Sequence, residues 1–240
     1  MISYSGNIGK STLASQLLLP RIQDAKLLLV ETLNAQPIAG VETHDPKRFE
    51  GILIALEVNK NVVVDVGSKD AATFIQQASK LDSLTSFDIF IVPTTSAQKV
   101  IADAASTIRV LNDHGIDGKR ILCLPTRVAE PGDIAADFAG VRMFIDQKLI
   151  DAQFDPSLFF EENEVFTRIN PAITTIDALA NDPTDWGEKL RTATTDEDRR
   201  DAAYSLINSK LAKGARRHLD TLFAGIVKAS AQARSKLKAA

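Results

Sequence analysis

Short apolar runs alternate with amphipathic stretches along most of the chain. The runs are continuous and do not alternate with polar residues, which is typical of strands buried on both faces of a parallel sheet. Between the runs, apolar residues recur at three- and four-residue steps, which indicates helices that pack by one face. We therefore predict strands at 2–5, 26–30, 61–64, 87–92, 120–124 and 157–160, and helices at 11–19, 46–58, 71–81 and 97–111.

This alternation of strands and helices predicts an α/β fold, in which a mostly parallel β-sheet is flanked by helices. The pattern changes between 181 and 200, where polar residues and Pro183 indicate loops and the start of a helix. A long helical stripe follows at 202–227, and the stretch 228–240 is poor in large apolar residues, so we expect it to be frayed or disordered. The sequence thus predicts an α/β domain at 1–180 and C-terminal helices at 181–240 that pack on the same domain.

Composition narrows the class of protein. Of the 240 residues, 45% are apolar and 25% are charged, which excludes a wholly disordered or collagen-like chain. The single cysteine, Cys123, cannot form an internal disulfide, and one cysteine with three histidines offers too few ligands for a typical zinc site. No apolar run approaches the ~20 residues that span a bilayer. We therefore expect a cytoplasmic protein with no membrane attachment.

The segment 5–12, named the phosphate loop below, follows the first strand-like run and opens a helix. In that context glycines let successive backbone N–H groups point at phosphate oxygens, and a helix N-terminus and a lysine add positive charge. Tyr4 occupies the first glycine position of the G-x-x-x-x-G-K-[ST] pattern, and the alternative reading is a simple helix cap. The residues expected to bind a nucleotide are Gly6, Asn7, Ile8, Gly9, Lys10, Ser11 and Thr12.

Two acidic residues follow strand-like runs at the same expected edge of the sheet. Asp65 ends the run 61–64, where an acid can hold a magnesium ion together with the hydroxyl of Ser11; the alternative role is a turn or a helix cap. Glu31 ends the run 26–30, and it either orients the attacking water or binds the metal, or forms a salt bridge at the sheet edge. The candidate catalytic residues are therefore Lys10, Glu31 and Asp65.

These residues together resemble a known family. The phosphate loop is similar to the deviant Walker A motif, K-G-G-x-G-K-[ST], of the ParA/MinD group of P-loop ATPases, with Ser5 and Asn7 in place of the first lysine and the second glycine. The segments 29–31, 62–65, 91–95 and 122–128 resemble the later strands of that family, so the resemblance extends over residues 1–175. The sequences of 4–14, 18–21 and 30–34 are similar to plasmid stability proteins of the StbB type.

The resemblance implies a P-loop ATPase fold that binds ATP and ADP with Mg²⁺ and hydrolyses ATP as a switch in plasmid partition or stability. It implies a small DNA-binding partner protein, and it places Thr126 and Arg127 beside the base. The family forms a nucleotide-sandwich homodimer through its first loop lysine, a charge that Ser5 does not supply. Hydrolysis is therefore expected to be slow or partner-dependent. A nucleotide-binding scaffold with little hydrolysis and a small-molecule kinase are the alternatives.

The end of the chain is basic. Between 208 and 240 a single acid, Asp220, stands against Lys210, Lys213, Arg216, Arg217, Lys228, Arg234, Lys236 and Lys238, although the net charge of the whole chain is −3. Such asymmetry predicts weak, non-specific DNA binding that requires the basic tail from 228 onward and falls steeply with salt. A docked helix with a solvated basic face is the alternative, and it is the favoured interpretation for 210–217.

Overall fold

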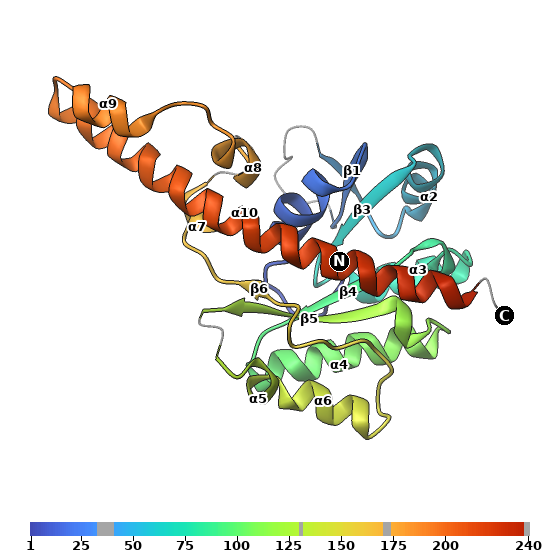
Figure 1. The fold of residues 1–240 in the computed structure, drawn as a ribbon. Coiled ribbons are helices and arrows are strands. Elements are labelled where there is room, and N and C mark those ends of the chain that lie inside the picture. Colours follow the sequence, from blue (N-terminus) through green and yellow to red (C-terminus); the bar gives the residue numbers. More distant parts are fainter. Residues whose placement is uncertain (33–40, 130–131, 170–173, 238–240) are drawn as a thin grey trace. The chain divides into compact units, whose positions relative to one another are not determined.

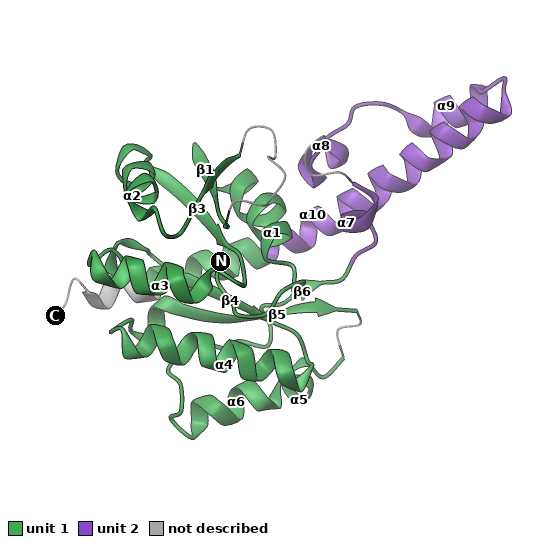
Figure 2. Cartoon of the chain, turned by 180° about the vertical axis from the view of Figure 1, so that it is seen from behind, with its two compact units in different colours: residues 1–162, 222–240 green, residues 163–221 purple. Residues whose placement is uncertain are grey.

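The computed structural model describes residues 1–32, 41–129, 132–169 and 174–237, with the backbone alone for 232–237 (Figure 1). The chain divides into two compact units (Figure 2). The first comprises Met1–Glu162 and Leu222–Ala240, and the second comprises Asn163–Thr221. The sequence placed the boundary at 180/181, whereas the units divide at 162/163 and at 221/222, because the last helix belongs to both.

Among the described residues, the first unit contains six strands in two parallel three-stranded sheets, with the orders β2-β1-β3 and β4-β5-β6. The α/β class and the parallel pairing predicted from the sequence are therefore confirmed. The strands are β1 (Ala25–Val30), β2 (Glu42–His44), β3 (Asn61–Val66), β4 (Phe90–Thr94), β5 (Ile121–Val128) and β6 (Phe160–Glu161).

Residues 1–3 lie between the two sheets and are hydrogen-bonded to both. On one side the Met1 nitrogen donates to the Val64 carbonyl at 2.7 Å, and the Val66 N–H donates back to the Met1 carbonyl at 3.0 Å. On the other side the Ile2 N–H donates to the Ile91 carbonyl at 3.1 Å. The first residues thus lie between β3 and β4, and the phosphate loop begins where they end.

Pro93 explains why this central segment forms no regular ladder with β4. In a regular parallel pair, the bond from the Ile2 N–H to the carbonyl of residue 91 is followed by a bond from the N–H of residue 93 to the Ile2 carbonyl. Proline has no N–H to donate. The predicted strand at 2–5 is therefore not a regular strand: its start is hydrogen-bonded to both sheets, and the chain bends at Tyr4.

Helices cover one face of the strands and bury most of the core there. Figure 1 and Figure 2 show α3 and α4 on this face. Phe74 of α3 and Ile108 of α4 pack in one cluster with Ile2, Val92 and Cys123 of the central strands. Helices of this unit include α2 (Phe49–Val58), α3 (Ala71–Lys80), α4 (Gln98–Asp113), α5 (Ile134–Asp137) and α6 (Ala139–Asp146), of which α2, α3 and α4 confirm the predicted helices at 46–58, 71–81 and 97–111.

The opposite face is covered by the helical segment 13–21 after the phosphate loop and by the end of the last helix. On β5, Leu122 and Leu124 are buried on this side, while Ile121 and Cys123 belong to the cluster on the other. Both faces of the strands are therefore covered, as continuous apolar runs predict. The residues buried on this second face include Leu13, Leu17, Leu222 and Ile226.

The helix predicted at 11–19 is irregular. It consists of α1 (Lys10–Thr12), a π-helical stretch (Leu13–Leu18) and a 3₁₀ turn (Leu19–Arg21). The Leu19 N–H donates to the Ala14 carbonyl, a five-residue step, and the next residue, Pro20, has no N–H to continue the helix. The Arg21 guanidinium donates instead to the Gln16 carbonyl at 3.0 Å.

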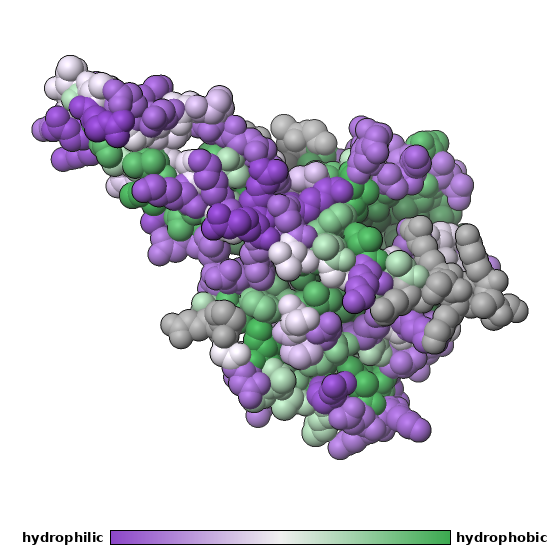
Figure 3. All heavy atoms as spheres, viewed as in Figure 1, coloured by the Kyte–Doolittle hydropathy of each residue, from purple (hydrophilic) through white to green (hydrophobic). Residues whose placement is uncertain are grey.

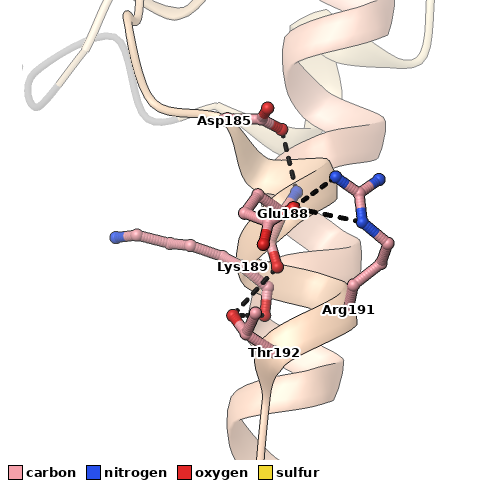
Figure 4. Close-up of polar contacts among 5 residues, drawn as sticks. All are labelled: Asp185, Glu188, Lys189, Arg191 and Thr192. Carbon is pink, nitrogen blue, oxygen red and sulfur yellow. Dashed lines mark hydrogen bonds and ion pairs between the residues drawn. The ribbon is translucent and has the colours of Figure 1, made fainter.

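The second unit is helical, with α7 (Val165–Arg168), α8 (Ile176–Ala180), α9 (Trp186–Thr192) and the first part of α10 (Asp196–Leu237). Asp185 caps α9 by accepting from the Glu188 N–H at 2.8 Å, and Glu188 also pairs with Arg191 (Figure 4). Hydrophilic residues dominate the visible surface of α9 and the first part of α10 (Figure 3). The hydrogen bonds and the ion pair of α9 stabilise this short helix. No cavity recorded among the described residues lies beside them.

The long last helix corrects one prediction. The sequence predicted a helix at 202–227 and a frayed or disordered stretch at 228–240, but α10 continues to Leu237. Ala229 is buried, so small side chains pack in a stretch that has few large apolar residues. Residues 238–240 lie outside the described residues. No helix in the described part of the chain is long and apolar enough to cross a membrane.

Candidate functional site

The backbone of the phosphate loop is strongly curved. Asn7 has φ 53° and Gly9 has φ 87°, both in the left-handed region, with Ile8 between them. Left-handed residues next to ordinary ones turn successive N–H groups toward one side, which makes a concave anion-binding surface. Gly6, Asn7 and Ser11 are exposed, so this surface opens to solvent. The helix that begins at Lys10 adds its N-terminal N–H groups to the same side.

Lys10 lies across the loop. Its side chain is buried, with 8% of the residue exposed, and its Nζ donates to the Ser5 carbonyl at 2.6 Å. Burial lowers the pKa of Lys10, while the nearby carboxylates of Asp65 and Glu31 act to raise it. Lys10 is therefore within electrostatic reach of both other candidate catalytic residues, although 20 or more residues separate each of the three from the next along the chain.

Asp65 provides a half-satisfied carboxylate beside the loop. It is 4% exposed, and its Oδ2 accepts from the Ser11 hydroxyl at 2.6 Å. Its Oδ1 is buried and finds no hydrogen-bond partner among the described residues. A buried carboxylate oxygen without a partner needs a compensating ligand. A magnesium ion, which prefers oxygen ligands and retains water, fits this oxygen and the Ser11 hydroxyl.

The described part of the chain holds no cluster of three or more histidine, cysteine, aspartate or glutamate side chains placed for a metal. A magnesium ion at Asp65 and Ser11 would therefore take its other ligands from phosphate oxygens and water. That is the usual arrangement for magnesium bound with a nucleotide, as opposed to magnesium in an all-protein cage.

The ends of β1 and β3 approach closely beside the loop. The Gly67 N–H donates to the Val30 carbonyl at 2.9 Å. A Cβ at Gly67 would lie 3.2 Å from Asp70 Oδ2 and 3.4 Å from Glu31 Cγ, so a larger residue would push these groups apart. Asp70 is buried and accepts from the Thr32 N–H at 3.0 Å and from its hydroxyl. Asp70 thereby fixes the backbone next to Glu31, which is exposed at the edge of the loop.

The Ser5 side chain is held by α4. Its hydroxyl donates to Asp103 Oδ2 of α4 at 2.6 Å. The residue before it is held on the same helix, where the Tyr4 N–H donates to the Thr107 hydroxyl at 3.2 Å. Sequence reasoning missed Asp103 and Thr107, because these contacts join residues 98 and 103 positions apart in the chain. The regular apolar spacing at 97–111 indicated a helix that packs by one face, but no signal placed that helix near the loop.

Thr126 and Arg127 differ in their surroundings. Thr126 is 1% exposed, and its hydroxyl lies 2.9 Å from the Ile8 carbonyl oxygen and 3.0 Å from the Thr94 carbonyl oxygen. Arg127 is exposed, with φ 54°, and its side chain forms no recorded contact with the described residues. The structure thus places Thr126 against the loop backbone, while Arg127 lies at the surface nearby. Thr12 is half-buried in the first turn of the helix.

A separate cavity of about 600 Å³ lies in the first unit. Its walls include residues 61–64 and 66 of β3, residues 86–91, and Phe223 and Ile226 of α10, and none of its lining residues belongs to the phosphate loop. At the loop, by contrast, a buried lysine, a buried carboxylate and the Ser11 hydroxyl lie close together. The loop is therefore the candidate functional site.

No protein-family model matches this chain, and no curated protein is significantly similar to it. Its function must therefore be argued from the geometry of the loop and from the sequence pattern.

Proposed function

We propose that this protein binds ATP and ADP with Mg²⁺ at the phosphate loop and hydrolyses ATP slowly, as a switch. The convergence of Ser11 and Lys10 on a buried carboxylate with one unpartnered oxygen, Asp65 Oδ1, is the observation that carries the proposal. A loop that only capped a helix would not need a buried lysine and a buried acid beside it. Both groups are costly to bury, so their presence favours a charged ligand.

In the proposed complex the phosphates occupy the concave side of the loop. Lys10 exchanges its bond to the Ser5 carbonyl for bonds to phosphate oxygens, and the loop N–H groups donate to the same phosphates. Ser11 and Asp65 hold the magnesium ion, which when bound neutralises charge on the β- and γ-phosphates. Glu31, exposed at the loop edge, is the proposed group that orients the attacking water.

Slow turnover agrees with the surroundings of Ser5. Its hydroxyl is engaged with Asp103, so the first loop position offers no positive charge to a developing phosphate charge in this or another copy of the chain. A homodimer therefore remains a prediction, because Ser5 cannot supply the charge that would link the nucleotide sites of two copies. Arg127 remains the proposed contact to the base.

The biological setting of the proposal rests on the resemblance to ParA/MinD-type ATPases. It comprises a role in plasmid partition or stability, a small DNA-binding partner protein and a cytoplasmic location. The weak DNA binding predicted for the basic end is assigned to α10, where Lys210, Lys213, Arg217 and Lys228 are exposed and, among the described residues, form no recorded ion pair. Arg216 is less available, because it pairs with Asp177 at 3.2 Å.

DNA binding by α10 is tested by replacing these four exposed basic residues with glutamine. A gel shift of a short duplex by the wild type at low salt, lost in the variant and lost by the wild type at moderate salt, supports the proposal. An equal shift by both proteins assigns the basic face to solvation or to a protein partner.

Two other functions use the same loop. A scaffold would bind ATP with little hydrolysis, and a small-molecule kinase would transfer the phosphate to an acceptor. Incubation with γ-labelled ATP separates the three functions, because label is released as inorganic phosphate by an ATPase, stays on ATP with a scaffold and moves to an added acceptor with a kinase.

The proposal is tested directly by calorimetry with the Lys10→Ala variant. Loss of a charge-assisted contact to phosphate should weaken ATP binding by about tenfold or more. Lys69→Ala is the matched control, because Lys69 is exposed in the nearby turn after β3 and should not affect affinity. Equal affinity of the wild type and the Lys10→Ala variant for ATP would overturn the assignment of the loop.

A further inference from the structure

Thr126 is the one buried side chain of β5 whose recorded hydrogen bond reaches the phosphate loop. Its hydroxyl lies 2.9 Å from the Ile8 carbonyl and 3.0 Å from the Thr94 carbonyl of β4, and the residue is 1% exposed. A hydroxyl has one proton to donate, so the two carbonyl oxygens share it. The loop is thereby joined to the ends of two strands by a single group.

The direction of the Ile8 carbonyl decides the direction of the next N–H. In a trans peptide the C=O and the N–H point to opposite sides of the same plane, and the chain contains no cis peptide among its described residues. Because the Ile8 carbonyl is drawn toward Thr126, the Gly9 N–H is directed away from β5. Gly9 is the left-handed residue next to Lys10, so this N–H belongs to the concave side of the loop.

We infer that Thr126 is a positioning residue, which aims the Gly9 N–H at a phosphate group by holding the Ile8 carbonyl. The inference rests on the proposed nucleotide-binding function, and it differs from the base contact that the family resemblance implied for this residue. Thr126 touches no phosphate itself. Its contribution is to the shape of the loop before the ligand arrives, so the loop N–H groups need not reorganise on binding.

The test compares ATP with tripolyphosphate, which has phosphates but no base or sugar. Both ligands are titrated by calorimetry into the wild type and into Thr126→Val, which keeps the side-chain volume and removes the hydroxyl. We expect affinity to fall on the order of tenfold for both ligands, because one preorganised donor is lost in each case. Thr126→Ser, which keeps the hydroxyl, should restore wild-type affinity for both.

Thr94→Val is the matched control. Thr94 is also fully buried at the end of a neighbouring strand, but its hydroxyl bonds to the Thr95 carbonyl, and its own carbonyl is unaffected by the change of side chain. This variant should bind both ligands as the wild type does. A comparable loss in Thr94→Val would show that any buried threonine here matters for packing, which contradicts the inference.

The remaining outcomes are equally decisive. A loss for ATP alone, with tripolyphosphate unchanged, places Thr126 at the base and overturns the inference. Wild-type affinity in Thr126→Val overturns it as well, while the proposed function stands; a wild type that binds neither ligand refutes the proposed function itself. If Thr126→Val does not fold, the carbonyl ¹³C shift of Ile8 in the wild type decides, because a value typical of a free carbonyl contradicts the inference.

Discussion

Replacing Asp65 with asparagine separates the role of its charge from the role of its shape. Asp65 is buried, with one oxygen bonded to Ser11 at 2.6 Å and the other unpartnered among the described residues. The amide keeps the first bond in a neutral form and loses the attraction to the buried Lys10 cation, which together cost about 1–3 kcal/mol. Removing a buried charge with an unpaired oxygen regains about 1–3 kcal/mol. We therefore expect the free energy of unfolding of the free protein to change by less than about 2 kcal/mol.

The response to ligand should change more clearly. A ligand at a hundred times its dissociation constant stabilises the folded state by about 2.7 kcal/mol, and a tenfold loss of affinity reduces this to about 1.4 kcal/mol. We expect that reduction in Asp65→Asn for ATP with magnesium. With ATP and a chelator the two proteins should respond alike, and turnover measured by phosphate release should fall more than binding.

Urea unfolding followed by circular dichroism measures each of these free energies. Asp70→Asn is the matched control, because Asp70 is another buried acid at the same sheet edge whose bonds go to Thr32. It should alter the stability of the free protein and leave the magnesium-dependent increment intact. An unchanged increment in Asp65→Asn would refute the metal assignment, and a loss of more than about 4 kcal/mol in the free protein would identify Asp65 as a structural residue.

Three further predictions concern other parts of the molecule. Burial raises the pKa of Cys123 to about 12, so alkylation at pH 8 should be slow until urea unfolds the chain. The free energy of unfolding should also fall between pH 9 and about 12, where only the unfolded thiol ionises. Rapid labelling of the folded protein would contradict this. Hydrogen bonds from Thr184 and the Trp186 indole lower the pKa of Asp182, so this carboxylate stabilises the folded state above its ordinary pKa of 3.8 and the effect is lost as pH falls through the lowered value; fluorescence of the single tryptophan should stay constant down to pH 3.8, and an earlier change would disprove the contact. Ser5→Ala removes a donor to Asp103 and should lower the free energy of unfolding by about 1–2 kcal/mol in urea, an effect that should vanish when Asp103 is already alanine.

The central strands could be predicted because their apolar runs are continuous. The run at 61–64 became β3 and the run at 120–124 became β5, each with two or more further residues at its end. The strand Glu42–His44 could not be predicted, because its three residues are polar and pair with a neighbour on one side only. The strand expected at 157–160 overlaps β6 only at Phe160, since a two-residue strand leaves almost no pattern to detect.

The candidate site was predictable only where its residues are local or carry a strong motif. The phosphate loop and the acid at Asp65 follow from spacing, and the structure brings Ser11 to that acid. The contact of Thr126 with Ile8 joins residues 118 positions apart, so no local pattern could indicate it. The prediction of fraying near the C-terminus was wrong, because alanine and lysine favour helix strongly even where large apolar side chains are scarce.

The central position of residues 1–3 has a consequence for the order of folding. These residues precede their partners Val64 and Ile91 by 60 to 90 positions in the chain. Loop closure over such separations is slow, and a segment that waits for both neighbours enters its sheet late. The anchor of the phosphate loop is then among the last pieces to assemble. A chain stalled or cleaved before Ile91 would carry the whole loop sequence and still lack half of the hydrogen-bonded frame that gives the loop its shape.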